Sequence, residues 1–441
     1  MARAAAGRRV SAGMPLPGPL RALLLRPVLA NSAALVVLRA TNLAARLALL
    51  FVIARLVQPT EFGLVVFALS IVEIAKVVSD FGMDTLSIRE YAMDRDAPAR
   101  TRFAASLAAS KLVLGSVVYA ALAAYFLITR SPEQATLGLV IGLSMFTALL
   151  TNFSLDHFQA RLSVIKVLPQ VVLANVALTI VAVLLLPRIG DLRAKVLCFP
   201  LIELVGGLVL LSALRREGLL GKPTLVFGQV LSLMRRSVPI ALTGIVIMMY
   251  SRMDVLVLAG RLGETAVGYY GIAFRMTEPF QLAAAAFGMS VFSRFSALFH
   301  GAAPATLRPL AIRYVLPTLG YGLVTSLALG LLAPPLVARW LPAYAAAVPI
   351  LRILAGALVF RTMNATLAGI LQGAGRFRLL TGLAVWNLAL TYGLLVVLVP
   401  RFGAPGAAWA GLIGEAFNML LHAVLVMRTI AAREMTVAHA G

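Results

Sequence analysis

Residues 33–54 read AALVVLRATNLAARLALLFVIA. As an α-helix these 22 residues would extend about 33 Å, and the hydrocarbon core of a bilayer is about 30 Å thick. The segment therefore predicts a transmembrane helix. Three polar side chains interrupt it, Arg39, Asn42 and Arg46, and their i, i+3, i+7 spacing places them on one helix face. We expect that face to point away from lipid.

Eleven further segments have the same apolar character, so the chain is predicted to be an all-α polytopic membrane protein with about twelve transmembrane helices. The composition agrees, because 61% of the residues are hydrophobic and only 13% are charged, against roughly 25% charged in soluble domains. The single cysteine, Cys198, excludes intramolecular disulfides, and no Cys/His spacing predicts a metal site or a cofactor. The predicted spans are 33–54, 62–80, 103–128, 135–155, 167–186, 195–214, 238–259, 265–291, 312–338, 348–371, 379–399 and 404–427.

The net charge of +22 would suggest nucleic acid as the partner of a soluble protein. In this chain the loops on one side of the membrane hold 23 Lys and Arg and those on the other side hold 8. The positive-inside rule then places both termini in the cytoplasm, and no nucleic-acid partner is expected. Residues 1–30 are interpreted as a basic cytoplasmic extension with a short interfacial helix at its end, and residues 428–441 as a cytoplasmic tail.

Weak internal similarity indicates that the chain is a duplication. Gly63 matches Gly268, Gln159 matches Gln372 and Glu203 matches Glu415, at separations of 205, 213 and 212 residues. With an even number of spans in each half, the halves keep the same orientation in the membrane. We expect two parallel-related six-helix bundles, residues 31–214 and 238–427, joined by a cytoplasmic linker over residues 215–237.

Charged side chains within the predicted spans should face an interior, because each Arg or Lys facing lipid at the bilayer centre costs about 3 kcal/mol. Guanidinium groups in a wet cavity would bind an anion through charge-assisted, bidentate hydrogen bonds. Lys111 and Arg352 lie near span ends and are interpreted as snorkelling to the interface. The candidates for a cationic substrate-binding cavity are Arg39, Asn42, Arg46, Lys76, Arg252, Arg275 and Arg361.

The carboxylates of the spans are candidates for ion coupling. Pro279 follows Glu278 directly, lacks the N–H that would bond to the carbonyl of Arg275, and predicts a hinge. An alternative is that Glu73 with Lys76, and Arg275 with Glu278, are structural ion pairs, because each partner lies one turn away. The coupling candidates are Glu278, Asp254, Glu73 and Asp80.

Enzyme and ATPase motifs are missing from the sequence. Residues 218–222 (GLLGK) are too short for a phosphate-binding loop and precede a proline. Residues 94–96 (DRD) match a metal-dependent sugar-transferase motif but lie in a short charged loop, which favours a solvated segment. The chain is therefore not expected to be an enzyme or to be driven by ATP.

Several segments resemble the polysaccharide transporter (O-antigen flippase) family of the multidrug/oligosaccharidyl-lipid/polysaccharide exporter superfamily. The likeness covers roughly residues 30–425 and rests on the order and spacing of its pieces. In the first half these are residues 54–63 (ARLVQPTEFG), residues 79–82 (SDFG) and Arg89. In the second half they are residues 252–254 (RMD), 260–263 (GRLG), 267–271 (VGYYG), Arg275, 344–352 (YAAAVPILR) and 372–376 (QGAGR).

The resemblance implies a V-shaped flippase in the inner membrane of a bacterium. Such a protein moves an undecaprenyl-pyrophosphate-linked oligosaccharide, such as an O-antigen, exopolysaccharide or capsule unit, by alternating access without ATP. Polysaccharide polymerases and glycosyltransferases of the same pathway are the implied partners. Two alternatives stay open: a cation-coupled drug exporter of the same superfamily, which would need an excess of cavity carboxylates, and a membrane polysaccharide polymerase or ligase, which would need a long outer loop.

Overall fold

The computed structural model describes residues 18–93, 97–218, 227–301 and 307–438, which consist of helices and short connections, with no strand in those ranges. The first nine α-helices are α1 (Gly18–Leu56), α2 (Pro59–Asp80), α3 (Met83–Ala92), α4 (Ala97–Thr129), α5 (Pro132–Gly142), α6 (Ser144–Ala160), α7 (Leu168–Leu185), α8 (Leu192–Val196) and α9 (Cys198–Arg216). The last five are α10 (Phe227–Leu262), α11 (Glu264–Gly301), α12 (Leu307–Trp340), α13 (Ala347–Gly373) and α14 (Phe377–Ala438).

Eleven helical segments in the described ranges are long and apolar enough to cross a membrane. The eleventh, Phe377–Arg433, contains Gly403, whose φ of 65° and ψ of −144° are not helical. This residue divides α14 into two spans, so the prediction of an all-α protein with about twelve transmembrane helices is confirmed. Because glycine lacks a Cβ, it adopts such a positive φ at little cost.

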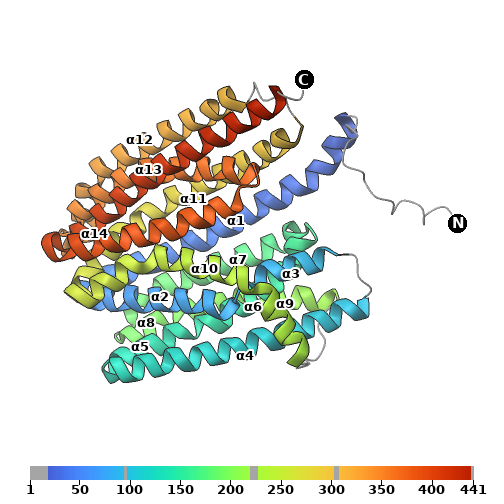
Figure 1. Cartoon of the computed structure of the whole chain (residues 1–441). Coiled ribbons are helices and arrows are strands. Elements are labelled where there is room, and N and C mark those ends of the chain that lie inside the picture. The colour runs from blue at the N-terminus through green and yellow to red at the C-terminus, as the bar shows by residue number, and fades with distance from the viewer. Residues whose placement is uncertain (1–17, 94–96, 219–226, 302–306, 439–441) are drawn as a thin grey trace.

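The helices form two lobes (Figure 1). Helices α4 to α6 lie on one side of the molecule and α12 to α14 on the other, with α1, α2, α10 and α11 between them. The first described residues of α1 and the end of α14 lie at the same end of the molecule, which we call the termini end. The opposite end carries the α1–α2 and α10–α11 turns and is called the hairpin end.

At the hairpin end the two lobes meet through residues related by the sequence repeat. The hydroxyls of Thr60 and Thr265, 205 residues apart, are 2.7 Å from each other. A Cβ on Gly63 would lie 1.8 Å from the carbonyl oxygen of Glu264, and a Cβ on Gly268 would lie 2.0 Å from that of Pro59. Pro59 and Glu264 are also 205 residues apart, so each contact has a partner with the lobes exchanged. This reciprocity is the signature of a two-fold axis.

Helix boundaries differ from the sequence expectations in three places. Helix α1 begins at Gly18 and continues through the segment expected to be a separate interfacial helix, while residues 1–17 lie outside the described residues. Residues 227–237 of the expected linker belong to α10. The short helix α3 follows α2 after a turn in which Phe81 and Gly82 have positive φ. Apolar periodicity alone does not predict α3, because this helix is only ten residues long.

Candidate functional site

Five charged side chains from both lobes form an ion network, here called the central network. Glu73 of α2 accepts a hydrogen bond from Arg46 of α1, and its other oxygen, Oε2, lies 2.5 Å from Nε of Arg252 on α10. Arg252 also reaches to 4.0 Å from Glu278 of α11, which is bonded by Arg275 of the same helix. Glu73 therefore bridges the two lobes. It is not paired with Lys76, its neighbour one turn along α2.

The central network follows the two-fold repeat. Arg46 and Arg252 are 206 residues apart, and Glu73 and Glu278 are 205 apart. Each lobe thus contributes one arginine and one glutamate from corresponding helices. Arg275 is the exception, because the residue 205 positions earlier is Ser70, whose hydroxyl bonds to the carbonyl of Val66 within α2.

Charge and exposure divide the network into two kinds of residue. Three arginines and two glutamates give it a formal charge of +1. The side chain of Arg46 is 33% exposed, whereas that of Arg275 is 2% exposed. Arg46 is thus partly exposed, whereas Arg275 is buried and bonds to Glu278. The Oε2 atoms of Glu278 and Glu73 are buried and have no hydrogen-bond partner among the described residues.

A second polar cluster lies in the α10–α14 lobe around Glu415. Its carboxylate accepts from Nε of Arg361 at 2.8 Å, from the hydroxyl of Tyr250 at 3.0 Å and from Nδ2 of Asn364 at 2.8 Å. The guanidinium carbons of Arg361 and Arg252 lie 5.8 and 5.7 Å from the centroid of the Phe274 ring. This aromatic ring connects the Glu415 cluster with the central network through cation–π contacts.

The corresponding carboxylate of the first lobe is Glu203, at the repeat position of Glu415. Lys76 donates to its two oxygens at 3.0 and 3.2 Å, and Thr147 donates at 2.9 Å. Sequence reasoning used Glu203 only to align the halves and missed it as a site residue. The repeat could have revealed it, because Glu203 and Glu415 occupy the same position in the last predicted span of each half. A carboxylate kept in both halves is expected to face the interior of its lobe.

Asp80 lies away from the central network, in a third cluster near the termini end. Lys111 bonds to Asp80 at 2.8 Å and also to Asp84, which accepts from Asn152 at 2.8 Å. These carboxylates line a small cavity of about 160 Å³. Lys111 is 2% exposed, so the expectation that it snorkels to the interface is wrong. Burial raises the pKa of the Asp84 carboxyl, but the Lys111 charge and the side-chain hydrogen bonds to Asp84 together lower it by more, and the net shift is downward.

The remaining predicted residues lie outside the clusters described above. Asp254 accepts from Tyr270, a residue that sequence reasoning did not select. Asn42 accepts from Asn175 at 2.7 Å. Arg39 is exposed on α1 and has no ion pair among the described residues. Helix α11 continues through Pro279. Within the ranges that the structure describes, no group of three or more His, Cys, Asp or Glu is arranged to hold a metal ion.

Comparison with solved structures defines the class of fold. The lipid II flippase MurJ in an inward closed conformation matches with a TM-score of 0.72 at 13% identity, over 91% of this chain and 89% of that chain. An inward-facing multidrug resistance MATE family transporter of the MOP superfamily matches with a TM-score of 0.69 at 16% identity, over 91% and 99%. An outward-facing MATE family transporter matches with a TM-score of 0.64 at 16% identity, over 93% of this chain and 96% of that chain. The fold is that of the MOP superfamily of flippases and transporters.

Family comparisons define the chain more narrowly. The polysaccharide biosynthesis protein family matches residues 28–299, and the MatE family matches residues 239–396. No curated protein matches the sequence. Since the first of these matches covers more than half of its length, the chain belongs to the polysaccharide biosynthesis protein family. The resemblance noted from the sequence is confirmed, and the relatives are transporters and flippases rather than enzymes.

Proposed function

We propose that this protein is a flippase that moves an undecaprenyl-diphosphate-linked oligosaccharide across the cytoplasmic membrane of a bacterium by alternating access, without ATP. The observation that carries the proposal is the sharing of Glu73 by Arg46 and Arg252 across the lobe junction. A diphosphate has two linked anionic groups, and two arginines related by a two-fold axis offer each group one guanidinium.

Binding and movement are linked through the same carboxylate. A diphosphate that takes over Arg46 and Arg252 releases Glu73 and removes an ion pair that joins the lobes. A ligand shifts a conformational equilibrium only by its different affinity for the two states, and breaking this bridge supplies such a difference. Arg361 and Lys76, whose side chains are 25% and 27% exposed, extend the cationic surface towards the glycan.

Ion coupling is assigned to Glu278. Anion binding to Arg252 withdraws positive charge from this carboxylate, whose Oε2 already lacks a hydrogen-bond donor in the described structure. Proton uptake at Glu278 would then accompany substrate binding. Asp254 and Glu73 are secondary candidates, and Asp80 is the weakest because it is occupied by Lys111. Both termini face the cytoplasm in this proposal, where glycosyltransferases of the pathway would supply the substrate.

The test is transport by the purified protein in proteoliposomes. A fluorescent undecaprenyl-diphosphate oligosaccharide is placed in both leaflets, and its exposure to a membrane-impermeant quencher is followed with time. In wild type the quencher should reach the probe of both leaflets with time. In the double variant Arg46→Ala/Arg252→Ala it should reach the probe of the outer leaflet alone, and the control Arg352→Ala, outside all three clusters, should match wild type. Absence of transport by wild type, or normal transport by the double variant, would overturn the proposal.

The MatE family match over residues 239–396 favours export of a small molecule as the second candidate. The same proteoliposomes decide between the two functions. An exporter would move a cationic dye against an imposed sodium or proton gradient and leave the lipid-linked oligosaccharide where it was.

A further inference from the structure

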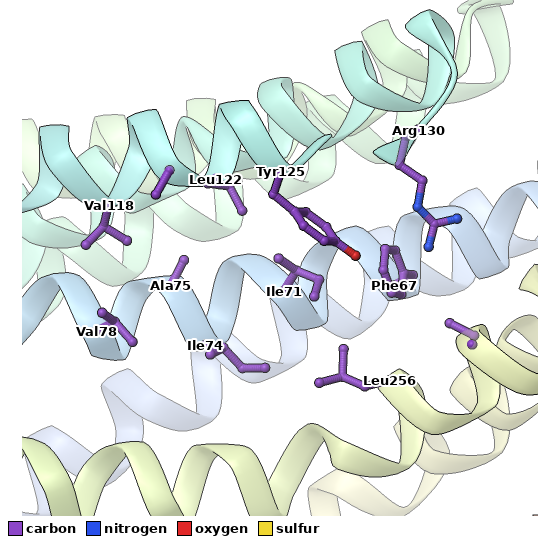
Figure 2. Close-up of a pocket in the computed structure, with 13 residues that line it drawn as sticks. Phe67, Ile71, Ile74, Ala75, Val78, Val118, Leu122, Tyr125, Arg130 and Leu256 are labelled. Carbon is purple, nitrogen blue, oxygen red and sulfur yellow. The ribbon is translucent and has the colours of Figure 1, made fainter. Parts of the chain in front are cut away.

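An apolar groove of about 480 Å³ lies at the surface of the molecule between α2, α4 and α10 (Figure 2). Ile71, Ala75 and Val78 line it from α2, Val118 and Leu122 from α4, and Leu256 from α10. The first two helices belong to one lobe and α10 to the other, so the groove follows the lobe junction. Its walls offer hydrogen-bond partners only at the end where Tyr125 and Arg130 lie.

The shape of the groove fits a hydrocarbon chain. Along α2 the lining residues extend from Phe67 to Val78, which is about 16 Å of helix and roughly half of the ~30 Å hydrocarbon core. Arg130 stands at the Phe67 end, with its guanidinium carbon 4.3 Å from the centroid of that ring. Arg130 also bonds to Glu264 of the other lobe at 2.8 Å, so an interlobe ion pair limits the groove at the hairpin end.

The groove and the central network share two helices, α2 and α10. Glu73 of the network and Ile74 of the groove are consecutive on α2, and Arg252 of the network is one helical turn before Leu256 of the groove. An amphiphile with an anionic head at Arg252 therefore has an apolar channel for its tail one turn away. Neither a soluble anion nor a free hydrocarbon would use both surfaces.

We propose that this groove binds the polyisoprenoid tail of the lipid-linked substrate while the diphosphate occupies the central network. The inference rests on the proposed function and adds where the lipid part is held. The tail stays in the apolar layer beside α2 and α10 as the head passes between the lobes. The groove changes shape when the lobes move, because α10 moves with one lobe and its other two walls move with the other.

Gly260 of α10 provides a way to fill the groove without disturbing the fold. It lines the groove, is exposed, and a Cβ built on it meets nothing within 4 Å. Gly320 of α12 is also exposed, helical and free of neighbours within 4 Å, but lies outside the groove. Gly260→Leu and Gly320→Leu are therefore a matched pair, with the same chemical change at equally open helical positions.

The experiment measures binding of two probes to the full-length protein in nanodiscs. Undecaprenyl diphosphate has the long tail, and geranyl diphosphate has the same head with two isoprene units. Displacing about two methylene groups from the groove should weaken undecaprenyl diphosphate binding by Gly260→Leu about tenfold. Binding of geranyl diphosphate should stay unchanged, and Gly320→Leu should behave as wild type with both probes. Arg46→Ala/Arg252→Ala should weaken both probes alike.

The outcomes separate the groove from the function. Unchanged undecaprenyl diphosphate binding by Gly260→Leu, with loss of both probes in the arginine variant, would overturn the groove and leave the proposed function intact. If Gly260→Leu co-purifies with less phospholipid than wild type but binds undecaprenyl diphosphate equally well, the groove holds a bilayer lipid. That result would also overturn the proposal. If wild type binds neither probe, both proposals fail. Ala121→Leu, which fills the groove from α4, replaces Gly260→Leu should that variant not fold.

Discussion

Arg46 and Arg252 form ion pairs with different oxygens of Glu73, although they come from different lobes and lie 206 residues apart in the sequence. The carboxylate is 11% exposed and Arg252 is 13% exposed, so the arrangement is a partly buried bridge rather than a surface ion pair. Breaking this bridge leaves Arg46 and Arg252 without their carboxylate partner. An anionic ligand that takes the place of the carboxylate is favoured for that reason.

The first prediction concerns Arg46, the most exposed arginine of the central network. Arg46→Ala should weaken binding of undecaprenyl diphosphate by about 1.5–3 kcal/mol, the range for a hydrogen bond to a charged group. Arg46→Lys should recover only part of this, because an ammonium is a point charge without the guanidinium fork. Titration of the probe into nanodiscs measures both. Equal affinity of the Ala variant and wild type would exclude Arg46 from the anion site.

Glu278→Gln tests coupling. Glutamine keeps the shape of the side chain but does not take up a proton, so transport by this variant should lose its response to an imposed pH gradient while transport down a concentration gradient continues. Proteoliposomes with acidic and neutral interiors supply the comparison. A wild-type response to the gradient would make the Arg275–Glu278 pair purely structural. Glu133→Gln is the control with the same chemical change, because Glu133 is an exposed carboxylate on α5 outside the central network and its variant should retain the response.

A third prediction follows from the backbone contact at the hairpin end. Gly63→Ala and Gly268→Ala each place a Cβ within about 2 Å of a carbonyl oxygen, so α2 and α11 must separate. Overpacking of this kind costs about 1–3 kcal/mol, which thermal unfolding in detergent should detect as a lower midpoint. Gly320→Ala, with open space around it, should not lower the midpoint. Equal midpoints for all three variants would mean that the lobes are not in contact there.

The fourth prediction ranks the two repeat-related carboxylates. The side chain of Glu415 is 6% exposed and accepts from three donors, whereas the side chains of Glu203 and its partner Lys76 are 30% and 27% exposed. Glu415→Ala should therefore destabilise the protein more than Glu203→Ala, because burial makes an unpaired partner costlier and solvent screens the more exposed pair. Thermal midpoints of the two variants provide the comparison. The reverse order would contradict the assigned partners.

The spans were predictable from the sequence because the length of an apolar segment is set by the bilayer. Arg39, Asn42 and Arg46 were placed on one helix face by spacing alone, and the match of Gly63 with Gly268 anticipated the two-fold relation between the halves. The break inside α14 was also predictable, because the predicted spans 379–399 and 404–427 end and begin on either side of Gly403, where the backbone leaves the helical conformation.

Partners across helices were the part that sequence could not supply. Spacing along α2 offered Lys76 as an alternative partner of Glu73, since the two lie one turn apart. The actual partners of these residues come from α1, α9 and α10, because helix packing brings opposite charges closer than a turn of one helix does. Lys111 was misjudged for the same reason. Its distance from the end of the span indicated the interface, and only the fold places Asp80 and Asp84 beside it.

The reciprocal contact of Pro59 with Gly268 and of Glu264 with Gly63 has a consequence for ancestry. It is the contact that a homodimer of half-length chains would make on its symmetry axis, where one mutation changes both sides at once. Fusion of the two copies into one gene removes that constraint, and each side can then diverge alone. Ser70 and Arg275 occupy equivalent positions with different chemistry. A central site with an unequal number of charges on its two sides is available to the fused chain and forbidden to the symmetric dimer.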